Sequence, residues 1–128
     1  MNRSTAGGLI AVIVALSAVL SWQFVRGTWL SVQLSFADEH TEIFAEMVTK
    51  ASEALNQSPP EVHAAVGYLQ YVHTYYPSGT KQTVGSQLDI AVERTRSLAE
   101  LQIIGMLRKA TGTDLGDDAE DWIREYSD

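Results

Sequence analysis

The chain has 128 residues, with 9 Lys and Arg against 16 Asp and Glu, which gives a formal net charge of −7. This length suits one small domain. The chain contains no cysteine, so disulfide bonds and thiolate metal sites are excluded. The acidic balance argues against nucleic acid as a partner, because nucleic-acid binding depends on a basic patch that neutralises phosphates.

The strongest pattern is an uncharged apolar segment near the N-terminus. No charged residue occurs from position 4 to 25, and positions 9–20 are almost wholly apolar. A helix of about 20 such residues spans the hydrocarbon core of a bilayer. Trp22 and Trp29 follow near its end, where indole rings favour the headgroup layer. We therefore predict that residues 1–26 form a membrane anchor.

The flanking charges predict an orientation for this anchor. Arg3 and the α-amino group lie on one side of the apolar segment, and Arg26 lies alone on the other. Because cytoplasmic flanks carry more positive charge, this pattern favours a single-pass membrane protein with a cytoplasmic N-terminus and an extracytoplasmic C-terminal part. The alternative is a cleaved signal peptide, since positions 15–17 and 19–21 both have small-residue cleavage geometry. The rest would then be a secreted helical domain.

Small residues recur on one face of the anchor. Gly7, Ala11, Ala15 and Ala18 are spaced 4, 4 and 3 residues apart, so they share one side of a helix. Such a pattern lets membrane helices approach closely. It predicts self-association through this face, and the alternative is that Gly and Ala are simply common in such segments.

Beyond the anchor, helical spacing of the apolar residues predicts an all-α fold, with about three bundled helices and a short C-terminal helix. Segment 27–57 is expected to continue the membrane helix to about residue 55, although its first part alternates with strand period. Segment 58–112 is expected to form a helical hairpin. Its second helix has a broad apolar belt that includes Ile90, Leu98 and Leu101, which suits the centre of a bundle.

Capping residues predict where the helices start, and one large apolar residue predicts how the last segment packs. Ser58 with Glu61 three residues later fits a capping box. Ser86 is expected to cap the next long helix, and Asp117 or the residue after it is expected to cap the last one. Segment 113–128 is expected to be a turn and a short helix that docks on the bundle through Trp122, its largest apolar residue.

Catalytic and metal-binding motifs are missing from the sequence. His40, His63 and His73 are the only histidines, and none belongs to a metal-binding motif. The acidic run at 114–121 lacks the ligand order of a calcium-binding EF-hand, and no nucleophile elbow or phosphate-binding loop occurs. We therefore expect no enzyme activity, no cofactor and no metal. The alternative is a metal-dependent sensor or enzyme that uses His40 and His73.

Tyrosines mark a candidate interface. Tyr68, Tyr71 and Tyr75 share one face of the helix that follows Ser58, and tyrosine is enriched at protein interfaces. With His40, they form the predicted contact surface, and packing against the core is the alternative. The sequence thus predicts a membrane-tethered helical module that contacts another protein or a second copy of itself, or serves as an accessory subunit of a membrane complex.

Three stretches, at 76–82, 86–94 and 107–122, resemble small bacterial membrane-anchored helical proteins of uncharacterised function. The last stretch also resembles the closing segment of some exported helical-repeat proteins, where a T-G-x-D-x-G-x-D-(P/A)-E-x-W string follows the final helix. Here Ala119 stands where proline is frequent. The resemblance covers about the last 50 residues. It implies that the ending is a structural cap on a helical stack, and it implies no activity.

Overall fold

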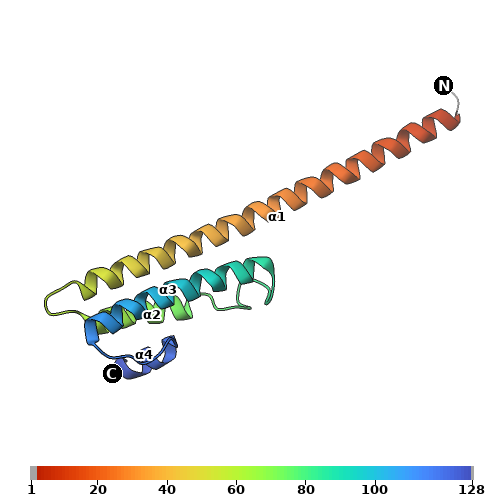
Figure 1. Ribbon diagram of the computed structural model, residues 1–128. Helices are drawn as coiled ribbons and strands as arrows, with labels where there is room; N and C mark the ends of the chain where they lie inside the picture. The colour runs from red at the N-terminus through yellow and green to blue at the C-terminus, as the bar shows by residue number, and fades with distance from the viewer. Residues whose placement is uncertain (1–2, 128) are drawn as a thin grey trace. The chain divides into compact units, whose positions relative to one another are not determined.

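The computed structural model describes residues 3–127 and, from residue 7 on, their side chains. It contains four helices: α1 (Arg3–Leu55), α2 (Val62–Thr74), α3 (Gln87–Thr111) and α4 (Ala119–Tyr126) (Figure 1). Residues 3–127 include no strand. The predicted all-α fold, with a long N-terminal helix, two further helices and a short C-terminal one, is confirmed. The strand-like alternation after residue 27 therefore does not produce a strand.

The chain divides into two compact units, and the division falls between Phe36 and Ala37, within α1. The first unit is a single stretch of helix whose side chains from residue 7 to 32 are all exposed. It includes one stretch that is long and apolar enough to cross a membrane, judged by length and composition, and none of that stretch is buried. Ala and Leu favour helix and the first proline is Pro59, so nothing interrupts α1 before Leu55.

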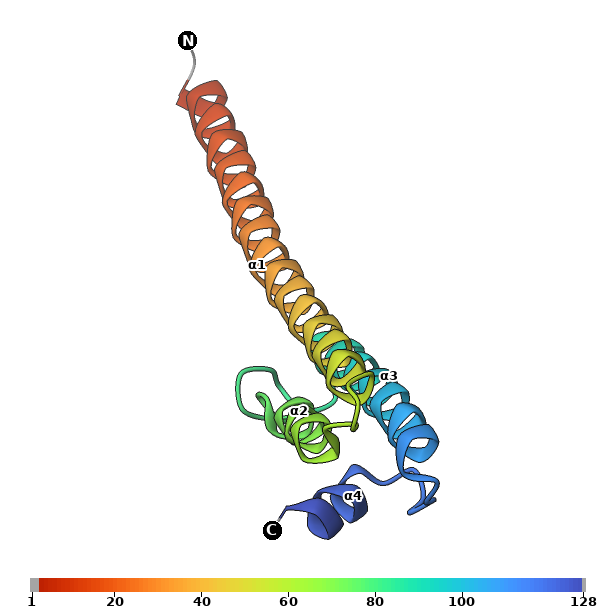
Figure 2. The same cartoon turned by 90° about the vertical axis from the view of Figure 1, so that its left-hand side faces the viewer.

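The second unit buries one apolar core. Figures 1 and 2 show α2 beside α3 and α4 close to α2, in agreement with the contacts among these three helices. The end of α1 contributes apolar residues at intervals of three and four, which places them on one helical face. The apolar core residues with less than 2% of their surface exposed come from all four helices: Phe44, Ala51, Ala65, Leu69, Val72, Val92, Ile103, Ile104, Leu107 and Trp122.

The predicted capping box at the start of α2 is wrong. The helix begins at Val62, its N-cap residue is Glu61, and no side-chain hydrogen bond caps it. The reason is the Pro59-Pro60 pair, because a residue before proline is disfavoured in the helical region. Pro59 therefore cannot open the helix, and Ser58 lies too far upstream to cap it.

Side-chain hydrogen bonds cap the first turns of α3 and α4. Ser86 caps α3 as predicted, since its Oγ accepts a hydrogen bond from the backbone N–H of Asp89 at 3.1 Å. The cap of α4 is Asp118, whose Oδ1 accepts from the N–H of Glu120 at 3.0 Å. Asp117, the first of the two predicted caps, instead accepts a hydrogen bond from a different side chain, described below.

Asp89 holds the loop between α2 and α3. Its Oδ2 accepts hydrogen bonds from the backbone N–H of Gly85 and from the hydroxyl of Ser78, both at 2.8 Å. These two bonds lower the pKa of Asp89 below its ordinary value. A carboxyl group whose folded-state pKa is lowered stabilises the fold above its unfolded pKa of about 4, and this contribution is lost as the pH falls through the lowered value.

Candidate functional site

An open groove of about 620 Å³ lies between the end of α1 and α2, within the second unit. It brings two of the three predicted interface tyrosines together with an apolar part of α1 that the sequence did not assign to an interface. We call it the tyrosine groove. It is lined by Ile43, Glu46, Met47 and Lys50 from α1 and by Ala64, Gly67, Tyr68 and Tyr71 from α2.

The groove owes part of its space to small residues on α2. Gly67 is exposed in the middle of that helix, and a Cβ atom at this position would meet no atom within 4 Å. Opposite, Ile43 is half-buried and Met47 is 8% exposed, so the α1 wall is apolar. Methionine is a flexible side chain that adapts to varied partner surfaces. The groove thus has an apolar α1 wall, and α2 adds no side chain to it at Gly67.

The rim of the groove carries one charge of each sign. Lys50 donates a hydrogen bond from Nζ to Oε1 of Glu46 at 2.7 Å, one helical turn away, and both side chains are about half exposed. This hydrogen bond raises the pKa of Lys50 above its ordinary value. An exposed pair of this kind contributes little to stability. Its charges remain accessible to polar groups of a partner.

The three tyrosines differ in their surroundings. Tyr71 is 45% exposed and stacks on Tyr75, with ring centroids 5.3 Å apart. Tyr75 in turn contacts the ring of Phe44 edge-on, at 6.3 Å between centroids, and its burial raises its pKa. Tyr75 therefore belongs to the edge of the core and supports Tyr71, whereas Tyr68 and Tyr71 line the groove.

The prediction that His40 lines the interface is corrected by its burial. Only 1% of its surface is exposed, and its ring lies 5.2 Å from that of Tyr75 and 5.8 Å from that of Phe44. It falls on the same helical face as Phe44, which points into the core. Histidine is a polar residue, which favoured an interface role for this position. Its place on the apolar face of α1 instead buries it in the core.

The other two histidines join helices. Nδ1 of His73 lies 2.9 Å from Oε1 of Glu100 on α3, and its Nε2 lies 3.6 Å from Glu120 on α4. Nδ1 of His63 lies 3.0 Å from the backbone carbonyl of Tyr126. Among residues 3–127, no three His, Cys, Asp or Glu side chains are placed to hold a metal ion. The described part of the chain thus gives no support to the metal-dependent alternative.

The C-terminal segment is organised as a cap. Arg108 donates from Nε to Asp114 at 2.8 Å and from Nη2 to Asp117 at 2.6 Å, so these carboxylates of the acidic run hold a guanidinium group. Gly112, at φ 68°, ends α3 in the left-handed conformation that glycine favours. Trp122 is fully buried, and its Nε1 donates to the carbonyl of Gly116 at 2.9 Å. The predicted docking through Trp122 is therefore confirmed.

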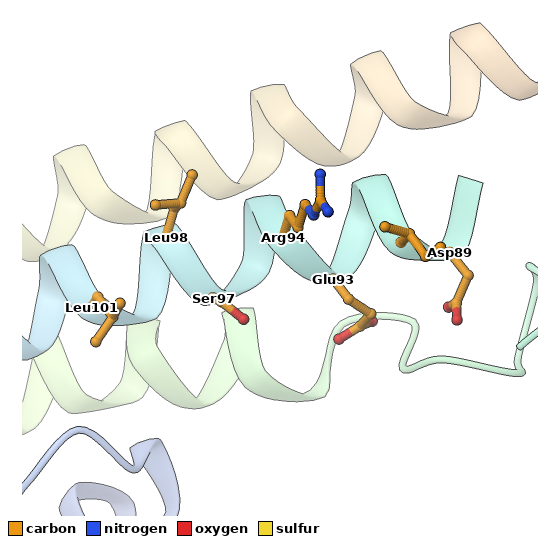
Figure 3. A pocket seen from close by; sticks show the side chains of 7 residues that line it. Asp89, Glu93, Arg94, Ser97, Leu98 and Leu101 are labelled. Atoms are coloured by element: carbon orange, nitrogen blue, oxygen red, sulfur yellow. The ribbon is translucent and has the colours of Figure 1, made fainter. Parts of the chain in front are cut away.

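A second apolar surface lies on the outer face of α3 (Figure 3). Ile90, Leu98 and Leu101 are 38%, 64% and 45% exposed and line a shallow hollow of about 590 Å³. The expectation that they belong to a buried belt is therefore wrong. The belt of apolar residues is broader than the side of α3 that its neighbours cover, so its outer part remains in solvent.

Comparison with known proteins returned no match: no family model fits the sequence, and neither a curated protein nor a solved structure is significantly similar to it. The resemblance of residues 76–122 to bacterial membrane-anchored proteins therefore stays a prediction. What the chain does is inferred below from the tyrosine groove and from the apolar part of α1.

Proposed function

We propose that the chain is a single-pass membrane protein that binds a segment of another protein in the tyrosine groove. The observation that carries this proposal is the composition of the groove, with an apolar floor at Met47 and Gly67, an exposed ring at Tyr71 and an ion pair at the rim. Protein interfaces have this organisation, since an apolar centre is surrounded by polar groups and tyrosine is enriched. An apolar groove between two helices suits the apolar face of an amphipathic helix.

The membrane anchor supports a role in tethering rather than in catalysis. The apolar stretch of α1 has the length and composition of a spanning helix, and Arg3 precedes it. By the positive-inside rule, the N-terminus is cytoplasmic and the second unit lies outside the cytoplasm. The chain would then present its groove to an extracytoplasmic or membrane-bound partner.

A photo-crosslinking amino acid at Tyr71 in the full chain tests the groove in membranes of the native cells. We expect a covalent adduct of one defined mass, because an occupant of the groove would lie against this ring. The matched control is Gln70, which is also exposed on α2 but does not line the groove. It is expected to give no such adduct.

A second variant, Gly67→Leu, fills the groove from the α2 side. Because a Cβ atom there meets open space and leucine is a better helix former than glycine, the fold should be retained. We expect Gly67→Leu to abolish the adduct at Tyr71. An adduct that survives this change, equal adducts at positions 70 and 71, or no adduct at Tyr71 would each contradict the proposal.

A further inference from the structure

We infer that two copies of this chain associate in parallel through one continuous face of α1. The inference rests on the membrane anchor of the proposed function and is independent of the tyrosine groove. We call this face the α1 seam. It extends the small-residue stripe beyond the anchor and consists of Gly7, Ala11, Ala15, Ala18, Trp22, Val25, Trp29, Val32 and Phe36.

The spacing of the seam is that of a coiled coil. From Ala15 to Phe36 the intervals alternate strictly between three and four residues, which is the a/d spacing of three successive heptads. This spacing of 3.5 residues keeps one face of a helix turned toward a partner helix. From Gly7 to Ala18 the seam residues are small, which allows close approach of two helices in lipid. Beyond Ala18 they become large and apolar.

The seam residues from Gly7 to Val32 are exposed. Trp22, Val25, Trp29 and Val32 are 69%, 63%, 63% and 59% exposed. Val32 lies seven residues after the last residue of the uncharged segment, which is about 10 Å along a helix. Its apolar side chain therefore lies beyond the predicted anchor, where an exposed apolar group is unfavourable and marks an interaction site.

The surface of the seam has the shape that a second copy requires. An apolar hollow of about 270 Å³ is lined by Val25, Thr28, Trp29 and Val32, together with Phe24. In a coiled coil, each a or d side chain inserts into a hole between four residues of the facing helix. Val25, Thr28, Trp29 and Val32 form one such hole, because they occupy positions d, g, a and d of consecutive heptads. The Trp29 side chain of the second copy is its occupant.

The flanking positions are compatible with a parallel pair of identical helices. In such a pair, a g residue of one helix faces the next e residue of the other. Ser21 would face Arg26, and Thr28 would face Gln33, so no two like charges oppose each other. The next d position is Glu39, where identical helices would place two carboxylates opposite each other. The seam therefore ends at Phe36, where the first unit also ends.

Disulfide formation at single introduced cysteines tests the seam, because the chain has no cysteine of its own. Full-length Val25→Cys and Val32→Cys, each in membranes under mild oxidation, are expected to form disulfide-linked dimers. Gly27→Cys and Ser31→Cys lie on the opposite side of α1 and serve as controls. Since a disulfide requires Cα atoms within about 7 Å of each other, we expect roughly tenfold less dimer at the two control positions.

Adding Trp29→Ala to Val32→Cys should reduce the dimer yield several-fold, because it removes the side chain that fills the hollow. Gly67→Leu, which fills the tyrosine groove, should leave the yield unchanged. Equal yields at all four cysteine positions, or no dimer at Val25→Cys and Val32→Cys in chains that remain in the membrane, would overturn the inference. The adduct at Tyr71 is measured separately, so a failed seam and a failed groove give different results.

Discussion

Replacing Trp122 with alanine is expected to lower the free energy of unfolding of the second unit by about 3–5 kcal/mol. The indole is fully buried, and Nε1 donates to the carbonyl of Gly116. The truncation therefore leaves a cavity and removes a hydrogen bond. Trp122 is also the largest buried side chain of α4, a helix of eight residues, so we expect α4 to detach from the bundle.

The measurement is denaturant unfolding of the full chain in detergent, followed by circular dichroism. The control is Leu34→Ala, which truncates an apolar side chain that is 65% exposed in the first unit and does not belong to the α1 seam. It should leave the unfolding midpoint of the second unit unchanged. A Trp122→Ala chain that unfolds at the same denaturant concentration as the unchanged chain would show that α4 is not docked through this ring.

Replacing Arg96 with methionine is expected to destabilise the second unit by about 2–4 kcal/mol. Arg96 is 5% exposed, and its guanidinium donates from Nη1 to the carbonyl of Val72 and from Nη2 to that of Tyr76 at 3.0 Å. The Val72 carbonyl lies in the last turn of α2, where carbonyl groups have no partners within the helix, and Tyr76 lies two residues beyond the helix. Nε also contacts Glu93 at 3.2 Å. Methionine fills similar space but donates to neither carbonyl, and the Tyr76 carbonyl is left with the longer hydrogen bond from Nε2 of Gln82 at 3.4 Å.

Arg94→Met on the same helix is the control for this substitution, because Arg94 is exposed. It should change the stability by less than about 0.5 kcal/mol. Arg96→Lys should recover only part of the loss, since an ammonium group cannot replace the planar fork of donors that reaches two carbonyls. If Arg96→Met and Arg94→Met unfold alike in urea, the buried arginine does not hold the end of α2.

The sequence predicted the helices well where a long apolar period or a single strong residue decides the structure. The period from Phe36 to Leu55 predicted the end of α1, Ser86 predicted the start of α3, and Trp122 predicted the docking of α4. The start of α2 was predicted wrongly. The spacing of Ser58 and Glu61 suggests a capping box, but Pro60 disfavours the helical conformation at Pro59, so the helix begins later.

The candidate site was predicted only in part, because periodicity shows which residues share a face but not how much of that face neighbours cover. Tyr68 and Tyr71 were among the predicted interface residues, whereas the groove also includes Met47, a core residue that is 8% exposed and was not assigned to an interface. The same limit explains the exposure of Leu98 on α3. Arg96 was missed because arginine is usually a surface residue, although its place on the stripe of buried residues at 92, 99 and 103 is a usable signal.

The most direct test of the membrane-tethered module is the mass of the full chain, expressed with a C-terminal tag and measured separately in membrane and soluble fractions. The account predicts the full-length mass in the membrane fraction, released by detergent and not by high salt. A soluble product that lacks residues 1–17 or 1–21 would contradict it, because the apolar segment would then be a cleaved signal peptide, and the mature protein would lack the tether and the small-residue part of the α1 seam.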